Sequence, residues 1–294
     1  MRRTAALHRW LYVLFLLWLP LGLAASTASQ PSVTSEPIII AHRGASGHAP
    51  EHTLSSYRLA ARMHAGYIEI DVQMTKDQKM IAIHDTTLAR TTNAESIYPN
   101  RAPWRVSDFS LNELKGLDAG SWFDGRFAAE RIPTLDEVVN MLKTEHIQTP
   151  LYIETKQPGI EAAVVRLLQK KGYLQPGRAM FQSFHPESLQ ALKVMIPRGI
   201  ALIQLVGENE ACHSDPVKLL QRIAVYADGI GLPISLATKE WVRTAHSLGL
   251  IVHIYTVNEP RDLARLCAIG IDGLFTDYPD RPARIGVCRR PPHP

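Results

Sequence analysis

The chain has 294 residues, of which 46% are hydrophobic and 20% are charged. Both fractions are ordinary for a globular protein, and the length allows one large domain or two small ones. The formal net charge is +4, from 32 basic and 28 acidic residues. Three basic residues lie within the first nine positions, so the chain from residue 29 onward has 29 basic and 28 acidic residues, a net charge of +1. A nearly neutral chain argues against a nucleic-acid partner, which needs a clustered basic face.

Residues 1–28 have the pattern of an export signal. Three arginines precede an apolar run from Trp10 to Ala25, and small residues follow that run. The run is shorter than the ~20 residues that a membrane-spanning helix needs. We therefore expect cleavage near residue 28, a linker over 29–36 and an exported protein, periplasmic or secreted, with no stable membrane span. An uncleaved N-terminal anchor is the alternative.

From residue 37 onward, short apolar and β-branched runs alternate with amphipathic segments. Several amphipathic segments begin at a helix-start signal such as Asp215-Pro216 and end at a glycine such as Gly249. Eight strands alternating with helices predict an α/β fold, a TIM (β/α)8 barrel. An open doubly wound sheet is the alternative, but no glycine-rich dinucleotide loop follows the first strand. We expect strands over Ile38–His42, Tyr67–Met74, Leu151–Lys156, Arg178–Phe184, Gly199–Val206, Gly229–Ile234, Ile251–Val257 and Gly273–Thr276, and helices around 53–64, 135–145, 160–171, 186–196, 216–225, 238–248 and 260–269.

Two segments interrupt this alternation. Met80–His84 follows the second strand after a turn too short for a parallel crossover, so it predicts a hairpin that extends that strand. Residues 86–131 have no clear period and predict a small insertion over the barrel mouth. The barrel domain then spans 37–285, and we expect the tail over 286–294 to be disordered.

The three cysteines give no framework for a metal or a disulfide. Cys212, Cys267 and Cys288 are far apart and form no CxxC pair, so a zinc site is not indicated. The sequence does not select a pairing, and we expect ordinary packed or tail cysteines.

Two carboxylates point together from the second strand. Glu69 and Asp71 are two residues apart, so their side chains share a face, and inside a barrel they repel unless a cation lies between them. A hard divalent cation such as Ca²⁺ or Mg²⁺ prefers oxygen ligands and fits this pair. In the third strand, Glu154 could complete a three-carboxylate site, and Lys156 would place a positive charge on a phosphate oxygen. An internal ion pair between Glu154 and Lys156 is the competing explanation.

Two histidines lie at strand ends near these carboxylates. His42 closes the first strand beside Arg43, and His84 ends the return strand of the hairpin. Imidazole exchanges a proton near neutral pH, and a guanidinium fork suits phosphate. Each histidine alone is more typical of a surface turn or a structural site. Together with the carboxylates and the basic residues they predict cleavage of a phosphate ester, with an acid and a base for the entering and leaving oxygens.

The same short motifs, in this order, resemble the glycerophosphodiester phosphodiesterase family from Ile38 to about Arg281. The ordered combination is specific, although each motif is short. The matching motifs are His42-Arg43-Gly44, Pro50-Glu51-His52-Thr53, Glu69-Ile70-Asp71-Val72, Thr75-Lys76-Asp77, His84-Asp85, Leu88-Ala89-Arg90-Thr91-Thr92, Ile153-Glu154-Thr155-Lys156, Ser183-Phe184, Tyr255-Thr256-Val257-Asn258 and Gly270-Ile271-Asp272-Gly273-Leu274-Phe275-Thr276-Asp277.

The resemblance implies a TIM barrel and a metal-dependent hydrolysis of glycerophosphodiesters to glycerol 3-phosphate and an alcohol. It also implies a role for each candidate residue: His42 and His84 as the acid/base pair, Glu69, Asp71 and Glu154 as ligands of one Ca²⁺ or Mg²⁺, Arg43 and Lys156 as phosphate contacts, and Glu51 as a supporting acidic residue.

Two positions depart from the family pattern. The family usually has Asn where this chain has His52, and Trp where it has Tyr255. Tyr255 keeps an aromatic wall but adds a hydroxyl. Neither change removes a proposed catalytic group, and both bear on which alcohol is preferred.

Two other functions stay open at this point. A lysophospholipase D-type enzyme would use the same strands, and it would be favoured by an exposed apolar rim. The candidate residues for this apolar rim are Trp104, Phe109, Trp122, Phe123 and Phe127. The second alternative is a catalytically dead, secreted phosphodiester-binding module, although a binder would not need both histidines.

Overall fold

The computed structural model describes residues 36–281. The predicted export signal at 1–28 and the predicted tail at 286–294 lie outside the described residues, and both stay predictions. Within the described range, the structure finds no helix that is long and apolar enough to cross a membrane.

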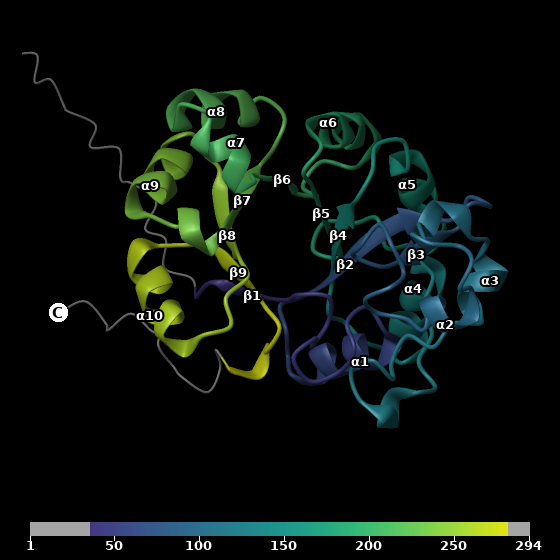
Figure 1. The fold of residues 1–294 in the computed structure, drawn as a ribbon. Coiled ribbons are helices and arrows are strands. Elements are labelled where there is room, and N and C mark those ends of the chain that lie inside the picture. Colours follow the sequence, from purple (N-terminus) through teal and green to yellow (C-terminus); the bar gives the residue numbers. More distant parts are fainter. Residues whose placement is uncertain (1–35, 282–294) are drawn as a thin grey trace, which may run out of the picture. The chain divides into compact units, whose positions relative to one another are not determined.

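Eight parallel strands close into a barrel in the described part of the chain (Figure 1). Each strand pairs in parallel with its neighbours, and β1 pairs with both β9 and β2, which closes the ring. The predicted TIM barrel is confirmed, and all eight predicted strands are present. The barrel strands are β1 (Ile38–Ala41), β2 (Tyr67–Met74), β4 (Leu151–Thr155), β5 (Ala179–Ser183), β6 (Leu202–Leu205), β7 (Gly229–Pro233), β8 (Ile251–Tyr255) and β9 (Gly273–Thr276).

The predicted helices surround the barrel, and local signals explain where they begin and end. Thr134 forms a capping box with Glu137 at the start of α4. At the start of α8, the side chain of Asp215 accepts a hydrogen bond from the backbone N–H of Lys218. Gly270 ends α10 in the left-handed conformation, with φ of 85°. The helices that were predicted are α1 (Leu54–Arg62), α4 (Leu135–Thr144), α5 (Glu161–Lys170), α6 (Pro186–Met195), α8 (Pro216–Ile223), α9 (Lys239–Ser247) and α10 (Pro260–Ile269).

Alternate residues of β2 serve two different layers. Ile68, Ile70 and Val72 pack into the core between the strands and the helices. Glu69 and Asp71 point the other way and line a pocket inside the barrel. The period of two in a strand therefore places both carboxylates on the inner face, as predicted. Below them the barrel is filled by a layer of large buried side chains: Ile40, Tyr152, Met180, Ile203 and Phe275.

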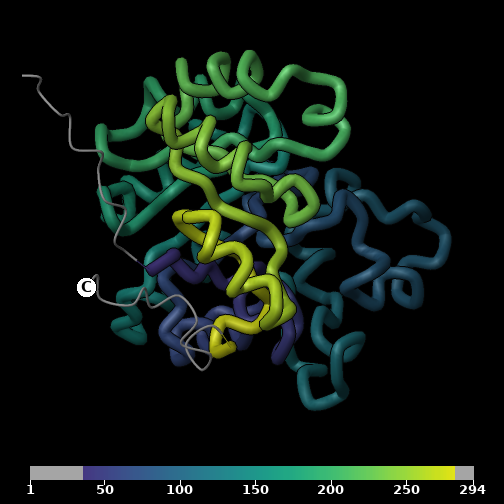
Figure 2. The backbone as a smooth tube through the Cα atoms, turned by 90° about the vertical axis from the view of Figure 1, so that its left-hand side faces the viewer, coloured from purple at the N-terminus to yellow at the C-terminus, as the bar shows by residue number. Residues whose placement is uncertain are grey.

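The hairpin after β2 is present, and the insertion lies on the flank of the barrel. β3 (Met80–Ala82) pairs antiparallel with β2 and is two residues shorter than predicted. Residues 86–131 contain four short helices that were not predicted: α2 (Ala94–Ile97), α3 (Leu111–Lys115) and the 3-10 helices η1 (Val106–Asp108) and η2 (Gly125–Phe127). Figure 2 shows this segment projecting to one side of the barrel.

The insertion has a core of its own, which explains its position. Ile81 and Ile83 of the hairpin pack with Leu88, Phe109 and Leu114 in one buried cluster. This apolar contact fixes the insertion against the hairpin. The expected cover over the barrel mouth is not observed: no residue from 86–131 lines the pocket inside the barrel in the described part of the chain.

The five aromatic residues considered as an apolar rim belong mostly to the insertion's packing. Phe109 is fully buried, and Trp104 packs against the same cluster. Phe123 contacts both Trp122 and Phe127 edge to face, with ring centroids 5.7 and 5.8 Å apart. Trp122 is the member of the group with a clearly exposed side chain. The insertion therefore offers little support for a lipid-binding rim.

The short helix α7 (Glu208–Cys212) follows β6 and was not predicted. It ends at Cys212, which is a free and exposed cysteine. Cys267 on α10 is disulfide-bonded, which differs from the expectation of ordinary packed cysteines.

Candidate active site

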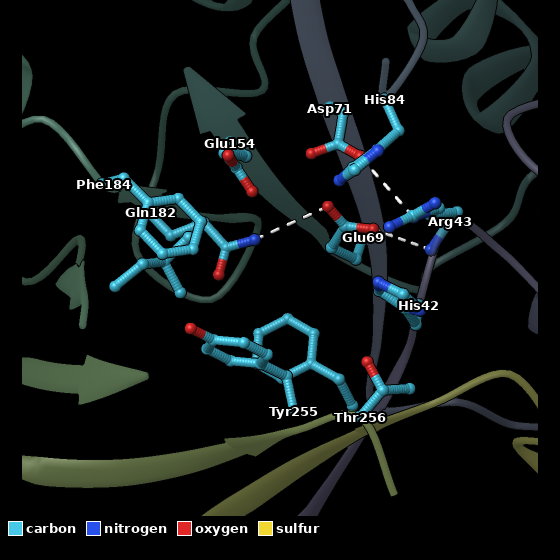
Figure 3. A pocket seen from close by; sticks show the side chains of 12 residues that line it. His42, Arg43, Glu69, Asp71, His84, Glu154, Gln182, Phe184, Tyr255 and Thr256 are labelled. Carbon is cyan, nitrogen blue, oxygen red and sulfur yellow. Dashed lines mark hydrogen bonds and ion pairs between the residues drawn. The ribbon is translucent and has the colours of Figure 1, made fainter. Parts of the chain in front are cut away.

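The predicted site residues gather in one pocket at the carboxyl ends of the barrel strands (Figure 3). The cavity has a volume of about 140 Å³. Six of the eight predicted residues line it, and the other two, Glu51 and Lys156, contact residues that do. The lining residues are His42, Arg43, Glu69, Asp71, His84, Glu154, Gln182, Phe184, Leu205, Tyr255, Thr256 and Phe275.

Three carboxylates are crowded into the buried part of this pocket. Glu69, Asp71 and Glu154 are each at most 6% exposed. Burial and the neighbouring carboxylates raise the pKa of Glu69 well above its ordinary value. The same causes raise the pKa of Glu154 to about 8. The electrostatic cost of ionising these groups together is what a cation between them would remove.

Two basic side chains offset part of this negative charge. Lys156 Nζ lies 2.9 Å from Glu154 Oε1 and 3.6 Å from Asp71 Oδ1. The internal ion pair considered as a competing explanation is therefore present. Arg43 Nε lies 3.8 Å from Asp71 Oδ2, and the backbone N–H of Arg43 donates to Glu69 Oε2 at 2.6 Å. Burial opposes ionisation of Asp71, but Lys156 and a hydrogen bond from His52 hold its pKa well below the ordinary value.

The ion pairs still leave oxygen acceptors for a cation. Asp71 Oδ1 and Gln182 Oε1 are buried and have no hydrogen-bond partner among the described residues. Buried oxygens without a partner are rare, because each carries a desolvation cost of ~1–3 kcal/mol. Together with the crowded carboxylates they form an oxygen-rich donor set, which fits a hard divalent cation. Among residues 36–281, one group of His, Cys, Asp or Glu side chains has possible metal-ligand atoms within 4.8 Å of one another, and its members are His52, Glu69 and Asp71.

His42 is oriented by a carboxylate from the opposite end of the sequence. Its Nδ1 lies 2.7 Å from Asp277 Oδ1, directly after β9. Asp277 also accepts hydrogen bonds from Ser46 Oγ at 2.9 Å and from Asn258 Nδ2 at 2.6 Å. Burial raises the pKa of Asp277, but the His42 contact outweighs it and the pKa falls to about 2. With Nδ1 engaged, Nε2 is the ring nitrogen left for a substrate.

His84 has a matching carboxylate partner. Its Nδ1 lies 2.7 Å from Asp85 Oδ1, and Arg90 Nε donates to the other oxygen of Asp85 at 2.6 Å. Arg90 also donates to both oxygens of Glu51, which in turn accepts from Arg43 Nη1 at 3.0 Å. Burial lowers the pKa of His84, and the hydrogen bond from Arg90 holds the pKa of Asp85 near 2. Arg90 thus connects the second histidine to the arginine of the pocket.

Sequence reasoning missed several members of the site. Asp85 and Arg90 belong to motifs that carried the family resemblance, but no role followed from them. Asp277 is also in such a motif, and only the closure of the barrel brings it to His42. Gln182 had no sequence signal. The apolar side of the pocket comes from Phe184, Leu205, Tyr255 and Phe275. Phe184 and Phe275 were in motifs without an assigned role, Tyr255 was expected as an aromatic wall, and Leu205 was in no motif.

The fold and the pocket define the class of protein: a TIM-barrel enzyme whose pocket gathers carboxylates, histidines and basic side chains at the carboxyl ends of the strands. The model of the glycerophosphoryl diester phosphodiesterase family matches residues 42–281. This chain belongs to that family.

Curated relatives and solved structures agree with this assignment. The chain is 39% identical over 292 residues to a glycerophosphodiester phosphodiesterase of Bacillus subtilis, covering 91% of this chain and 95% of the relative. It resembles the structure of an Oleispira antarctica phosphodiesterase in complex with the product sn-glycerol-3-phosphate, with a TM-score of 0.71 and 30% identity over 85% of this chain and 96% of the other. A glycerophosphodiester phosphodiesterase of Agrobacterium tumefaciens gives a TM-score of 0.68 and 28% identity over 84% and 99%.

Proposed function

We propose that this chain hydrolyses glycerophosphodiesters to glycerol 3-phosphate and an alcohol, with one divalent cation and with His42 and His84 as the acid/base pair. The observation that carries the proposal is the pair of histidines in one pocket, each held at Nδ1 by a carboxylate 2.7 Å away. The activity is supported by family membership and by the names of the relatives.

The cation would be held by Glu69, Asp71 and Glu154, whose oxygens suit Ca²⁺ or Mg²⁺. When bound, it supplies positive charge that stabilises the negative charge of the phosphoryl group in the transition state. The fit is supported by the unpartnered Asp71 Oδ1 and by the raised pKa of Glu154.

The two imidazoles would move the protons of the reaction. One accepts the proton of the attacking hydroxyl, which belongs to water or to the glycerol of the substrate, and the other donates a proton to the leaving oxygen. Asp277 and Asp85 keep Nδ1 of each ring engaged, so both transfers occur at Nε2. Which histidine is acid and which is base is set by the side of the phosphate on which the alcohol leaves.

The phosphate would be bound by Arg43 and Lys156. Arg43 Nε is buried and has no hydrogen-bond partner among the described residues, so it has an N–H to give to a phosphoryl oxygen. Glu51 holds the other end of the guanidinium at 3.0 Å and fixes its direction. Lys156 adds a point charge from the adjacent strand end.

A substrate panel tests the proposal directly. We expect the purified chain to release free glycerol 3-phosphate from glycerophosphodiesters, to lose activity with a chelator and to regain it with Ca²⁺ or Mg²⁺. Lysophosphatidylcholine in the same panel tests the lysophospholipase D-type alternative. If no diester were hydrolysed in the presence of either cation, the proposal would be refuted, and the catalytically dead binding module would be the remaining alternative.

We also propose that the chain is exported. The proposal is supported by the charged start and apolar run of residues 1–28 and by the disulfide at Cys267, because disulfides persist in oxidising compartments. N-terminal sequencing of the protein recovered from the periplasm or medium tests it. A cytoplasmic protein that retains Met1 would refute it.

A further inference from the structure

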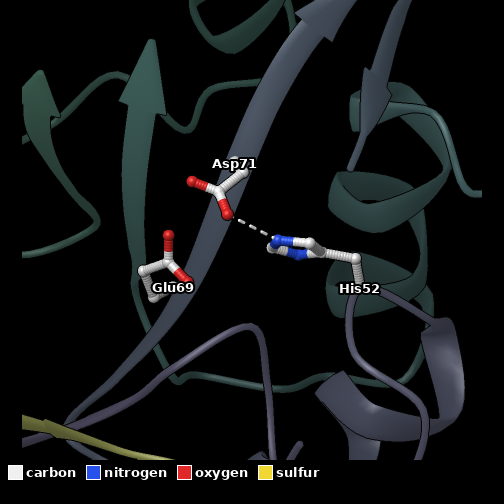
Figure 4. A group of neighbouring side chains, drawn as sticks. All are labelled: His52, Glu69 and Asp71. Atoms are coloured by element: carbon white, nitrogen blue, oxygen red, sulfur yellow. Dashed lines mark hydrogen bonds and ion pairs between the residues drawn. The ribbon is translucent and has the colours of Figure 1, made fainter. Parts of the chain in front are cut away.

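A buried histidine that is absent from the proposed mechanism joins a tyrosine to the carboxylate cluster. His52 is 4% exposed and follows the first strand in the loop before α1. Its Nε2 lies 2.8 Å from Asp71 Oδ2, and its Nδ1 lies 2.8 Å from Tyr57 Oη. Figure 4 shows the ring directed at Asp71, with Glu69 beside it. The result is a continuous line of hydrogen bonds from a helix to the pocket.

The chemistry of the partners fixes the direction of these hydrogen bonds. Carboxylate oxygens accept hydrogen bonds, so in the contact with Asp71 Oδ2 the ring of His52 donates from Nε2 and its Nδ1 is left as the acceptor. Burial raises the pKa of Tyr57 well above its ordinary value, so the phenol keeps its proton. The phenol can then donate to Nδ1, and every polar atom of the ring has a partner.

The two oxygens of Asp71 therefore have different environments. Oδ2 accepts from His52, whereas Oδ1 is buried without a hydrogen-bond partner among the described residues. Lys156 Nζ is 3.6 Å from Oδ1, which is an ion-pair contact and not a hydrogen bond. His52 therefore holds Oδ2, and Oδ1 is the oxygen of this pocket-lining residue that has no hydrogen bond.

We infer that His52 is a positioning residue for the divalent cation: it holds Asp71 Oδ2 and so presents Asp71 Oδ1 to the ion, while Tyr57 fixes the imidazole. This inference rests on the proposed function, since it concerns the cation of the same site. His52 would raise the affinity for the cation through Asp71, without binding the cation itself.

Both ring nitrogens of His52 are already used, which separates this role from direct ligation. His52, Glu69 and Asp71 have ligand atoms within 4.8 Å, so distance alone would permit a shared ion. A direct bond would require His52 Nε2 to give up Asp71 and lose its proton. An imidazole ligand would also favour a transition metal such as Mn²⁺ over Ca²⁺.

The surrounding backbone keeps the ring in register with Asp71. His52 has a positive φ of 53°, a conformation that is uncommon for this residue type, and its N–H donates to Arg43 O at 3.1 Å. The next residue, Thr53, caps α1, so the loop is tied to the helix that carries Tyr57. Tyr57 itself is fully buried. Ring, helix and strand thus form one rigid unit.

Titration calorimetry of the metal-free chain with Ca²⁺ and with Mn²⁺ tests the inference without measuring turnover. Hydrogen-bond partners of metal ligands typically change affinity by 10–100-fold, so we expect His52→Ala to raise the Kd for Ca²⁺ by about that factor. His52→Asn keeps an N–H donor for Asp71 and should recover most of the affinity. Tyr57→Phe removes one neutral hydrogen bond and should raise the Kd by about 2- to 10-fold. In the His52→Asn background, Tyr57→Phe should have no further effect.

The matched control is His246→Ala. His246 Nε2 also lies 2.8 Å from a carboxylate, Asp272 Oδ2, and neither residue lines the pocket in the described structure. We expect this variant to bind Ca²⁺ like the unaltered chain. Thermal unfolding of the metal-free variants separates a folding defect from a loss of affinity. If His52→Ala does not fold, His52→Asn and Tyr57→Phe still test the inference, because they keep most of the buried side-chain volume.

Three outcomes would overturn the inference, and they are distinguishable. Equal Ca²⁺ affinity for His52→Ala and the unaltered chain would remove His52 from the site. A selective loss of Mn²⁺ binding with unchanged Ca²⁺ binding would make His52 a direct ligand. If the unaltered chain bound neither ion, the cation dependence of the proposed function would fail and the inference with it.

Discussion

The substitution Asp277→Asn tests the acid/base assignment at its most specific contact. Asp277 Oδ1 holds His42 Nδ1 at 2.7 Å, and Asp277 Oδ2 accepts from Asn258 Nδ2 at 2.6 Å. An amide cannot accept at both ends, so Asn must turn an NH₂ group toward one of these two donors. A hydrogen bond to a charged group contributes ~1.5–3 kcal/mol, which is about 10- to 150-fold in rate. We expect kcat/KM to fall by that factor, while Ca²⁺ affinity stays unchanged.

The assay is glycerol 3-phosphate release as a function of pH, for the unaltered chain, Asp277→Asn and the control Asp272→Asn. Asp272 accepts from His246 at 2.8 Å, so the control removes a similar charge from a similar pair outside the pocket. Activity of Asp277→Asn within twofold of the unaltered chain would show that His42 does not depend on this carboxylate, and the proposed role of His42 would lose its main support.

The same residue gives a prediction for stability against pH. The pKa of Asp277 is about 2 in the folded chain, below its ordinary value of 3.8, and its side chain is 27% exposed. This difference corresponds to roughly 2 kcal/mol of stability, present above about pH 4 and lost as the pH falls through 2. Asp277→Asn should therefore unfold more easily in urea at pH 7, and the gap to the unaltered chain should close near pH 2. A gap that is independent of pH would contradict the pKa.

Three further predictions follow from the pocket. His42→Ala and His84→Ala should each lower turnover by about 10²-fold or more with an intact fold, and a near-full rate would remove that residue from the chemistry. Glu69→Ala should weaken the dependence of activity on added cation more than it lowers the melting temperature, and an unchanged metal titration would count against a ligand role. Arg90→Gln removes a positive charge that neutralises Asp85, so the limb of the pH–rate profile governed by His84 should move to higher pH, and an unshifted limb would contradict this coupling.

The barrel was predictable because its signals are local. The runs at Tyr67–Met74 and Gly273–Thr276 became strands with the predicted ends. Helices such as α4 were marked by a capping residue and by amphipathic spacing. The short helices α2 and α3 were missed because four or five residues are too few to show a helical period.

The site was predictable only in part, for a different reason. Residues two apart in a strand must share a face, so the pairing of Glu69 with Asp71 followed from the sequence. The partner of His42 lies 235 residues away, and no local pattern gives that contact. Gln182 and Phe184 face the pocket because β5 ends there, which depends on the register between strands.

The place where the ring of strands closes has a consequence for how activity appears during folding. His42 follows β1 and Asp277 follows β9, so their contact spans the seam between the first and last strands of the barrel. Glu69, Asp71 and Glu154 lie on β2 and β4, away from this seam, whereas His42 has its carboxylate partner only when β9 lies beside β1. Catalytic competence should therefore arise late and all at once, when the seam closes, and a newly made chain should stay inert until its C-terminal strand has docked.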